Sequence, residues 1–151
     1  MNKKVLVTGV AGFIGFHIAK KLIKKNFKVL GIDNLNNYYD VNLKKSRLEE
    51  LKKIAIFSKS FWKFAMGSIE NDIFIKDIFF DFNPDIVINL AAQAGVRNSI
   101  SNPKDYITSN LVGFSNILEA CRNFKVKNFL FASSSSVYGD ANEIPYKESQ
   151  H

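Results

Sequence analysis

The sequence contains little of what several classes of protein need. Its single cysteine, Cys121, has no partner for a disulfide within the chain, which favours a cytoplasmic location. The two histidines, His17 and His151, are too few to favour a histidine-based triad or metal site, so we expect no bound metal. No apolar run reaches the roughly 18 residues that a membrane-spanning helix needs, and we therefore expect no membrane segment.

A long basic run is also missing, although 21 Lys and Arg against 14 Asp and Glu give a net charge of +7. The lysines fall instead in short pairs at helical spacing in several segments. These pairs are Lys20 and Lys21, Lys24 and Lys25, Lys44 and Lys45, and Lys52 and Lys53. We interpret the pairs as solvated helix faces and expect no nucleic-acid partner. A basic surface still suits an anionic small molecule such as a nucleotide.

What is present describes an ordinary globular chain. Its 151 residues, 46% of them hydrophobic and 23% charged, correspond to one domain. Lys3 and Lys4 precede an apolar stretch, as in a signal peptide, but Thr8 and Gly9 interrupt it and no small-residue cleavage site follows. We therefore interpret the N-terminus as a strand followed by a glycine turn, and we expect the protein in the cytoplasm.

Apolar periodicity alternates between the patterns of strands and of helices along the chain. The expected strands cover residues 3–8, 28–32, 61–66, 85–90 and 127–132, and the expected helices cover residues 12–25, 39–53, 72–80 and 105–124. Such alternation is typical of an α/β fold with a parallel sheet and right-handed crossovers. We predict a Rossmann-type doubly wound parallel sheet of about five strands, truncated because this fold usually carries a sixth.

Three glycines, Gly9, Gly12 and Gly15, follow the first expected strand at intervals of three residues and open the first expected helix. One glycine permits a tight turn, another lets the backbone approach a pyrophosphate, and a third lets helix and strand pack closely. Free N–H groups at the helix N-terminus then attract phosphate oxygens. The pattern favours a dinucleotide-binding loop. The alternative is that the glycines only shape a tight strand-to-helix turn.

Asp33 ends the second expected strand, 18 residues beyond Gly15. An acidic residue about 20 residues after a glycine loop can accept hydrogen bonds from the ribose of a bound dinucleotide. Because its charge would repel the additional phosphate of NADP, Asp33 favours NAD. The alternative role is that of a turn or helix-cap aspartate before Asn34.

Four consecutive serines, residues 133–136, follow the fifth expected strand. Ligands of open α/β sheets bind beyond the carboxyl ends of the strands, where a group of hydroxyls can bind a substrate oxygen and pass a proton. Serines are also common in loops, so composition alone does not distinguish the two roles.

Three sequence runs together are similar to a known superfamily. They are the glycine pattern at residues 9–15, Asn89-Leu90-Ala91-Ala92 after the fourth expected strand, and Ser133-Ser134-Ser135-Ser136-Val137-Tyr138-Gly139 after the fifth. The runs resemble the extended short-chain dehydrogenases/reductases, in the branch of NAD-dependent sugar-nucleotide epimerases and dehydratases. More narrowly, residues 31–40, 91–97 and 109–114 resemble the UDP-glucuronate 4-epimerase family, and the similarity extends over essentially all 151 residues.

The resemblance implies roles for individual residues. It places Gly9, Gly12, Phe13, Ile14, Gly15, Asp33, Asn34, Leu90, Ala91, Ala92 and Asn110 at a bound NAD, with the glycine loop at its pyrophosphate. It implies that Ser134 and Ser136 are catalytic hydroxyls at the reacting sugar, and that Gln93, Arg97, Ser134 and Ser135 contact the UDP-sugar substrate. For Arg97, a role as a surface arginine is an equally good interpretation.

The family reaction that the resemblance implies is a transient oxidation of the sugar at C4, followed by re-reduction from the other face. A tyrosine acts as the base, and a lysine four positions later lowers its pKa. None of the five tyrosines of this sequence has such a lysine; the corresponding positions hold Asn42, Leu43, Asn110, Asn142 and Gln150. We therefore expect residues 1–151 to be the N-terminal, NAD-binding portion of such an enzyme, and to be inactive alone.

Several alternatives remain open at this stage. The parent enzyme could be another NAD-dependent UDP-sugar epimerase, a decarboxylase or a dehydratase, although a dehydratase is expected to carry acidic residues where Ser135 and Ser136 stand. The chain could also be a non-catalytic NAD- or nucleotide-binding module or an interaction module. A second chain that supplies the missing half, or a second copy in a homodimer, are the protein partners that this interpretation allows.

Overall fold

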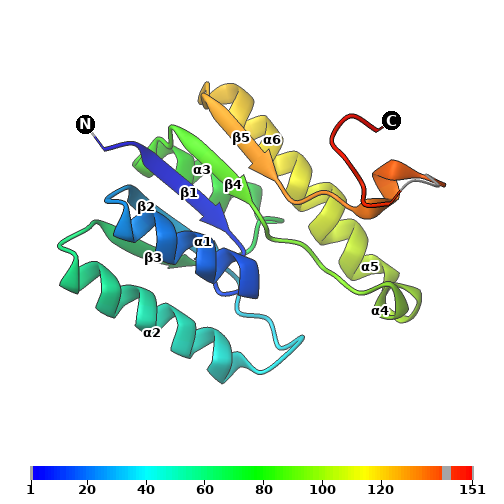
Figure 1. Ribbon diagram of the computed structural model, residues 1–151, viewed down its shortest axis with the longest axis horizontal. Helices are drawn as coiled ribbons and strands as arrows, with labels where there is room; N and C mark the ends of the chain where they lie inside the picture. The colour runs from blue at the N-terminus through cyan, green and yellow to red at the C-terminus, as the bar shows by residue number, and fades with distance from the viewer. Residues whose placement is uncertain (1, 141–143, 151) are drawn as a thin grey trace.

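A parallel sheet forms the centre of the computed structural model, which describes residues 2–140 and 144–150. Its strands are β1 (Lys4–Thr8), β2 (Lys28–Asp33), β3 (Trp62–Met66), β4 (Ile86–Asn89) and β5 (Asn128–Phe131). They lie in the order β3-β2-β1-β4-β5, and all neighbouring pairs are parallel (Figure 1). The predicted Rossmann-type α/β fold, with five strands in the described part of the chain, is confirmed.

The order of the strands reverses at β1, because β2 and β3 extend the sheet in one direction and β4 and β5 extend it in the other. Val5 of β1 accordingly pairs with Val29 on one side and with Ile86 on the other. The carboxyl ends of the strands point to the lower right in Figure 1. In a doubly wound sheet, a reversal of this kind opens a crevice beyond the carboxyl ends of the two central strands.

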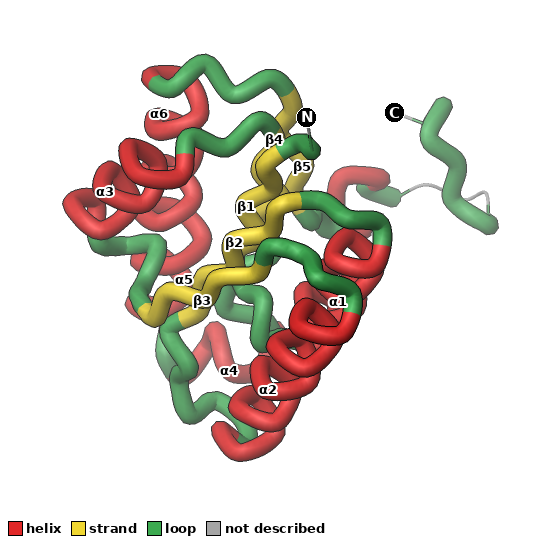
Figure 2. Tube along the Cα trace, turned by 90° about the vertical axis from the view of Figure 1, so that its left-hand side faces the viewer, coloured by secondary structure: helices red, strands yellow, loops and turns green. Residues whose placement is uncertain are grey.

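Helices form a layer on each face of the sheet (Figure 2). One layer contains α1 (Phe13–Lys24) and α2 (Val41–Phe57), and the other contains α3 (Asp72–Phe82) and α6 (Phe114–Asn123). Shorter segments lie near the carboxyl edge: α4 (Val96–Ser101), α5 (Pro103–Tyr106), the π-helix η1 (Ile107–Gly113) and the 3-10 helix η2 (Ser135–Tyr138). None of the described helices has the length and apolar character needed to cross a bilayer.

The core consists of two apolar clusters, one on each face of the sheet, because successive side chains of a strand point to opposite faces. In β1, Val5 and Val7 pack in the cluster of α1 and α2, whereas Leu6 packs in the cluster of α3 and α6. All three are fully buried. A strand covered on both faces has a nearly continuous apolar sequence, which explains why β1 and β4 are predictable.

Side-chain caps and one left-handed residue set the ends of α2 and α3. Asp40 accepts a hydrogen bond from the Asn42 N–H at 2.8 Å, and Asn71 accepts one from the Phe74 N–H at 3.0 Å. Asn83 follows α3 with a left-handed φ of 46°, directly before Pro84. Asn83 closes α3 at residue 82 instead of the predicted 80, and α2 ends at residue 57 instead of 53.

Two expectations for the segment between β4 and β5 need correction. The single helix predicted over residues 105–124 is divided into α5, η1 and α6, with the π-helix in the middle. Apolar spacing over seven residues does not distinguish an α-helix from the slightly wider π-helix. The short helix α4 was not predicted, because six residues with only two apolar side chains, Val96 and Ile100, give too short a periodic pattern, and none of its residues is buried.

Phe79 and Phe80 are neighbours in α3 with opposite environments, being 0% and 79% exposed. We expect Phe79→Ala to lower the free energy of unfolding by about 3–5 kcal/mol, because the substitution empties a core position. Phe80→Ala is the matched control and is expected to change that free energy by about 0.5 kcal/mol or less. Urea denaturation followed by circular dichroism measures both, and equal losses would contradict the assigned core.

Candidate functional site

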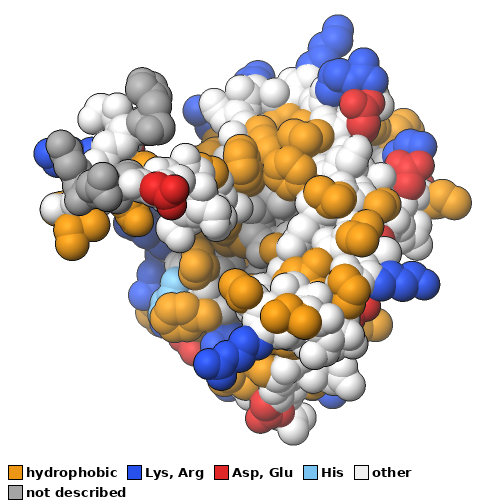
Figure 3. Space-filling model, turned by 90° about the vertical axis from the view of Figure 1, so that its right-hand side faces the viewer, with side chains coloured by type: hydrophobic (Ala, Val, Ile, Leu, Met, Phe, Trp, Pro, Cys, Tyr) orange, Lys and Arg blue, Asp and Glu red, His pale blue; other side chains and the backbone are white. Residues whose placement is uncertain are grey.

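Two adjoining cavities open at the carboxyl edge of the sheet, where Figure 3 shows a hollow in the surface. The first, of about 210 Å³, lies between the glycine turn, the loop after β2 and the turn after β3. The second, of about 610 Å³, lies between the segment after β4, the helices α5 to α6, and the end of β5. Residues 90–94 line both cavities, and we call this common wall the β4 strip.

The glycine turn, residues 9–15, passes so close to neighbouring backbone that it has no room for a side chain at Gly9 or Gly15. Gly9 has a left-handed φ of 64°, and a Cβ built on it would lie 2.8 Å from Ala91 N and from the carbonyl carbon of Leu90. A Cβ on Gly15 would collide with the Gly9 carbonyl oxygen, which accepts the Gly12 N–H at 3.0 Å. The glycines therefore set both the shape of the turn and its approach to the β4 strip.

The glycine turn leads into the N-terminus of α1, which begins at Phe13. Its N-cap residue, Gly12, has no side chain to cap the first turn, and that turn contains no acidic residue. Phe13 and Ile14 have exposed side chains. The N–H groups of a first helical turn, together with the helix dipole, attract anions. The predicted phosphate-binding residues Gly12, Phe13 and Ile14 thus lie together at a helix end that suits a phosphate.

Asp33 joins the end of β2 to the glycine turn. Its Oδ2 accepts a hydrogen bond from the Ala11 N–H at 3.0 Å, and its Oδ1 accepts one from the Leu35 N–H at 2.9 Å. Asp33 therefore has the turn role that the sequence allowed, and it also lies in the wall of the first cavity. Each carboxylate oxygen can accept a further hydrogen bond. Asn34, also in that wall, donates to Ser68 Oγ at 3.4 Å.

A buried polar network fixes the start of the β4 strip. Thr8 Oγ1 donates to Asn89 Oδ1 at 2.7 Å and accepts the N–H groups of Leu90, at 3.0 Å, and Ala91, at 2.9 Å. Thr8 is fully buried and Asn89 nearly so. One hydroxyl thus satisfies two backbone donors where β4 ends, as buried donors require.

Asn110, on the π-helix η1, holds the other part of the β4 strip. Its Oδ1 accepts the Gln93 N–H at 2.8 Å, and its Nδ2 donates to the Gln93 carbonyl oxygen at 2.9 Å. The structure therefore brings the predicted cofactor residues Leu90, Ala91, Ala92 and Asn110 together in one arrangement. In it, Thr8 anchors the beginning of the strip and Asn110 anchors residue 93.

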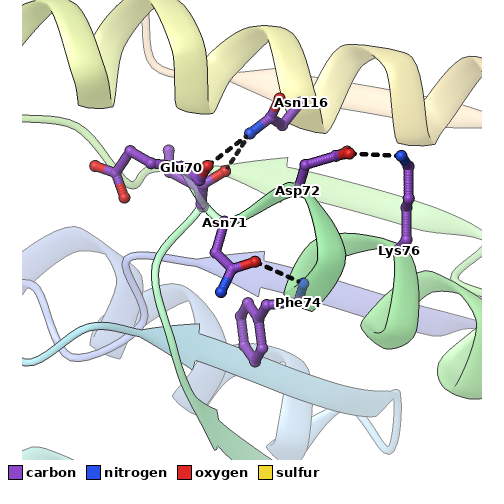
Figure 4. A network of polar contacts seen from close by, with 7 residues as sticks. Glu70, Asn71, Asp72, Phe74, Lys76 and Asn116 are labelled. Atoms are coloured by element: carbon purple, nitrogen blue, oxygen red, sulfur yellow. Dashed lines mark hydrogen bonds and ion pairs between the residues drawn. The ribbon is translucent and has the colours of Figure 1, made fainter.

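Hydrogen bonds tie the turn after β3 to η1 and α6, and Figure 4 shows those made by Asn116 of α6. Asn116 Nδ2 donates to the carbonyl oxygens of Ile69, at 3.0 Å, and Glu70, at 3.1 Å. Ser109 Oγ donates to Glu70 Oε1 at 2.5 Å, and both residues line the first cavity. Figure 4 shows Asn71 in the same turn, where it caps α3. Sequence reasoning missed Glu70 and Ser109, because neither belongs to a recognisable spacing pattern.

The serine run after β5 is divided between the second cavity and the surface. Ser133 and Ser134 line that cavity, whereas Ser135 and Ser136 do not. Ser134 Oγ accepts the Ser136 N–H at 3.2 Å and donates to Ser136 Oγ at 3.1 Å. The two hydroxyls predicted as catalytic are therefore neighbours, and Ser134 also caps η2.

The predicted substrate residues Gln93 and Arg97 are placed differently. Gln93 lines both cavities. Arg97 is an exposed residue of α4 that lines neither cavity, as a surface arginine would be placed. Asn142, four positions after Tyr138, and His151 lie outside the described residues.

Lys44 contradicts the expectation that the lysine pairs are solvated. It is only 4% exposed and lines the first cavity, whereas the adjacent Lys45 is exposed. Burial lowers the pKa of Lys44, and the charge of Asp33 partly offsets this effect. A pair of lysines in a sequence does not show which of the two faces inward, because the rotation of the helix against the sheet decides it.

Neither Cys121 nor a metal-binding group forms a second reactive centre in the part of the chain that the structure describes. Burial raises the pKa of Cys121 to about 11, so its thiol stays protonated at neutral pH. Within residues 2–140 and 144–150, no group of three or more His, Cys, Asp or Glu residues could hold a metal ion.

The strand order, the glycine turn before α1 and the cavities beyond the carboxyl ends define the class of this protein as a Rossmann-type α/β domain. Comparison with known families gives the more particular assignment. The chain belongs to the family described as GDP-mannose 4,6 dehydratase, whose model matches residues 6–151, among the extended short-chain dehydrogenases/reductases.

Individual relatives agree with this assignment. The chain is 49% identical over 148 residues to Protein CapI of Staphylococcus aureus, covering 98% of this chain and 42% of that protein. It is 50% identical over 133 residues to the UDP-glucuronate 4-epimerase of Thermodesulfobacterium geofontis, covering 88% and 40%. A variant of UDP-glucuronic acid 4-epimerase from Bacillus cereus, solved with UDP-4-deoxy-4-fluoro-glucuronic acid and NAD, matches with a TM-score of 0.81 and 32% identity, covering 98% and 45%. The chain thus spans about two fifths of the length of these curated relatives.

Gly9 and Gly139 offer a test of the close backbone approach, because both have a positive φ but only Gly9 is crowded. We expect Gly9→Ala to lower the free energy of unfolding by more than about 3 kcal/mol, because left-handed strain adds to overlap with the β4 strip. Gly139→Ala has open space around its Cβ, but its φ of 56° and ψ of −135° are nearly exclusive to glycine, so it should cost about 1–3 kcal/mol from strain alone. Thermal denaturation compares the two, and a Gly9→Ala protein as stable as the control would refute the crowding.

Thr8 allows a second test, since its hydroxyl and its methyl group can be removed separately. Thr8→Val keeps the shape but leaves the Leu90 and Ala91 N–H groups without their acceptor, which we expect to cost about 2–3 kcal/mol. Thr8→Ser keeps the hydroxyl and loses one methyl, at about 1 kcal/mol. Urea denaturation measures both losses. If valine were tolerated better than serine, the network would not hold the strip.

Proposed function

We propose that this chain binds NAD at the carboxyl edge of its sheet. The observation that carries the proposal is the hydrogen bond from the Ala11 N–H of the glycine turn to Asp33, in the wall of the first cavity. It brings an anion-attracting helix end and a carboxylate to one site, which suits the pyrophosphate and the ribose of a dinucleotide. The Bacillus cereus relative, solved with NAD, supports this assignment.

In this proposal, each part of the cofactor meets a different wall. Asp33 and Asn34 bind the adenosine ribose, and the pyrophosphate lies against the glycine turn. The pyrophosphate-binding residues are Gly9, Gly12, Phe13, Ile14 and Gly15. Leu90, Ala91 and Ala92 lie beside the nicotinamide half, while Asn110 keeps the β4 strip in place through Gln93.

We further propose that the chain is the NAD-binding part of an enzyme that epimerises a UDP-sugar of the UDP-glucuronate class at C4. Bound NAD supplies a reversible acceptor for the hydride on C4. The Ser134 and Ser136 hydroxyls orient the oxygen on C4, and Gln93, Arg97 and Ser135 contact the rest of the substrate. Similarity to the Thermodesulfobacterium geofontis epimerase favours this chemistry. Hydroxyls instead of acids at positions 135 and 136 favour it over dehydration.

The 151 residues contain no Tyr-x-x-x-Lys pair to act as the base, so we propose that they do not turn over UDP-glucuronate by themselves. Adding the C-terminal portion of a related UDP-glucuronate 4-epimerase to the purified chain tests this assignment. Restored epimerisation would support it, whereas binding of NAD without epimerisation would favour a non-catalytic NAD-binding module.

Calorimetric titration of the purified chain with NAD tests the cofactor proposal. We expect saturable binding of NAD and weaker binding of NADP, because the Asp33 carboxylate repels the additional phosphate. Asp33→Asn removes this charge and should narrow the difference between the two cofactors. Asp77→Asn, at an exposed position of α3, is the control and should leave the difference unchanged. Folded chain that binds neither cofactor would contradict the proposal.

A further inference from the structure

Helix α2 directs a buried cation at the loop that forms one wall of the first cavity. Lys44 Nζ donates to the backbone carbonyl oxygen of Asn36 and to its Oδ1, each at 2.7 Å. It also lies 4.5 Å from the centre of the Tyr39 ring, in a cation–π position. An ammonium group has three N–H donors. Two hydrogen bonds and one aromatic face therefore account for all three N–H donors of Lys44.

Arg47, three residues further along the same face of α2, links this loop to the glycine turn. Its Nη1 donates to the Ala11 carbonyl oxygen and to the Tyr39 hydroxyl, each at 2.9 Å. The Tyr39 hydroxyl donates to the same Ala11 oxygen at 3.3 Å. Since the Ala11 N–H is bound to Asp33, both polar groups of Ala11 are held by residues from the end of β2, the following loop and α2.

Apart from the contacts of Lys44, Tyr39 and Arg47, the loop between β2 and α2 is held by short-range bonds and by the hydrogen bond from Asn34 to Ser68 Oγ. The Asn36 N–H binds Asn34 Oδ1 at 3.1 Å, and the Tyr38 N–H binds Asn36 Oδ1 at 3.4 Å. Asn36, Tyr38 and Tyr39 line the first cavity together with Lys44. Within the described residues, Lys44 forms no ion pair. Its burial is offset by its two hydrogen bonds to Asn36, by the Tyr39 ring and by the more distant charge of Asp33. A charge buried at this cost, in a cavity wall, indicates a functional contribution.

We propose that Lys44 is a positioning residue for the adenosine half of the cofactor. It holds Asn36 and Tyr39 in place. Through Tyr39 and Arg47 it also fixes the Ala11 peptide, which links the glycine turn to the ribose-binding carboxylate of Asp33. This inference rests on the proposed binding of NAD and names a determinant that the motifs of the sequence do not include.

Lys44→Met tests the proposal, with Lys45→Met as the matched control on the same helix. Titrations with NAD and with ADP-ribose, which lacks the nicotinamide, are made well below the melting temperature of each variant. We expect Lys44→Met to weaken both ligands by about tenfold or more, because charged hydrogen bonds that shape the site are lost. Lys45→Met should bind both as the unmodified chain does.

The outcomes separate this inference from the cofactor proposal. If the unmodified chain binds no NAD, the proposed function itself fails. If that chain binds NAD and Lys44→Met binds within about twofold of Lys45→Met, only the positioning role is overturned. A lower melting temperature with unchanged affinity would likewise overturn it, because Lys44 would then be merely structural.

Tyr39→Phe provides a second variant in case Lys44→Met does not fold. It keeps the ring that Lys44 faces and removes the hydroxyl that donates to Ala11 and accepts from Arg47. Because Tyr39 is exposed, the fold should tolerate the change. We expect weaker binding of ADP-ribose and faster amide hydrogen exchange over residues 34–40, with exchange in α3 unchanged. Unaltered affinity and exchange in Tyr39→Phe would overturn the proposal.

Discussion

The close approach of Gly9 to the backbone of Leu90 and Ala91 determines how the glycine turn and the β4 strip meet at the carboxyl edge. β1 and β4 are paired neighbours, with Thr8 opposite Asn89, so the two segments that follow these strands must either diverge or come into contact. Because Gly9 has no side chain and a left-handed φ, they touch. The glycine turn and the β4 strip therefore form two sides of one site.

Polar side chains then fix this geometry by satisfying backbone groups where strands end. Thr8 takes the N–H groups of Leu90 and Ala91, Asn110 pairs with both polar groups of Gln93, and Asn116 holds the turn after β3. Buried backbone donors and acceptors just beyond the paired strands no longer bond to a neighbouring strand, so they need such side-chain partners. The same hydrogen bonds that satisfy backbone groups at the strand ends thus hold the walls of the two cavities in position.

The first cavity is surrounded by groups of both signs of charge, not by an acidic or a basic patch. An uncapped helix end attracts anions on one side, and the Asp33 carboxylate faces the cavity on another. Lys44 places a buried positive charge near Asp33 without an ion pair between them in the described residues, and burial lowers its pKa. The site therefore combines groups suited to a phosphate and to a ribose within one small cavity.

Strand and helix positions follow from local sequence, because burial on both faces of the sheet leaves continuous apolar runs and the glycine spacing marks the first turn. The same local patterns predict the positions of several site residues, because each lies next to the end of a predictable strand. These residues are Gly9, Gly12, Gly15, Asp33 and the serine run. Tertiary structure alone determines that Lys44 faces inward and Lys45 outward, that Asn110 lies on a π-helix and binds Gln93, and that Arg97 lines neither cavity. These features depend on how a helix is rotated against the sheet and on contacts between residues distant in the chain, neither of which leaves a periodic trace.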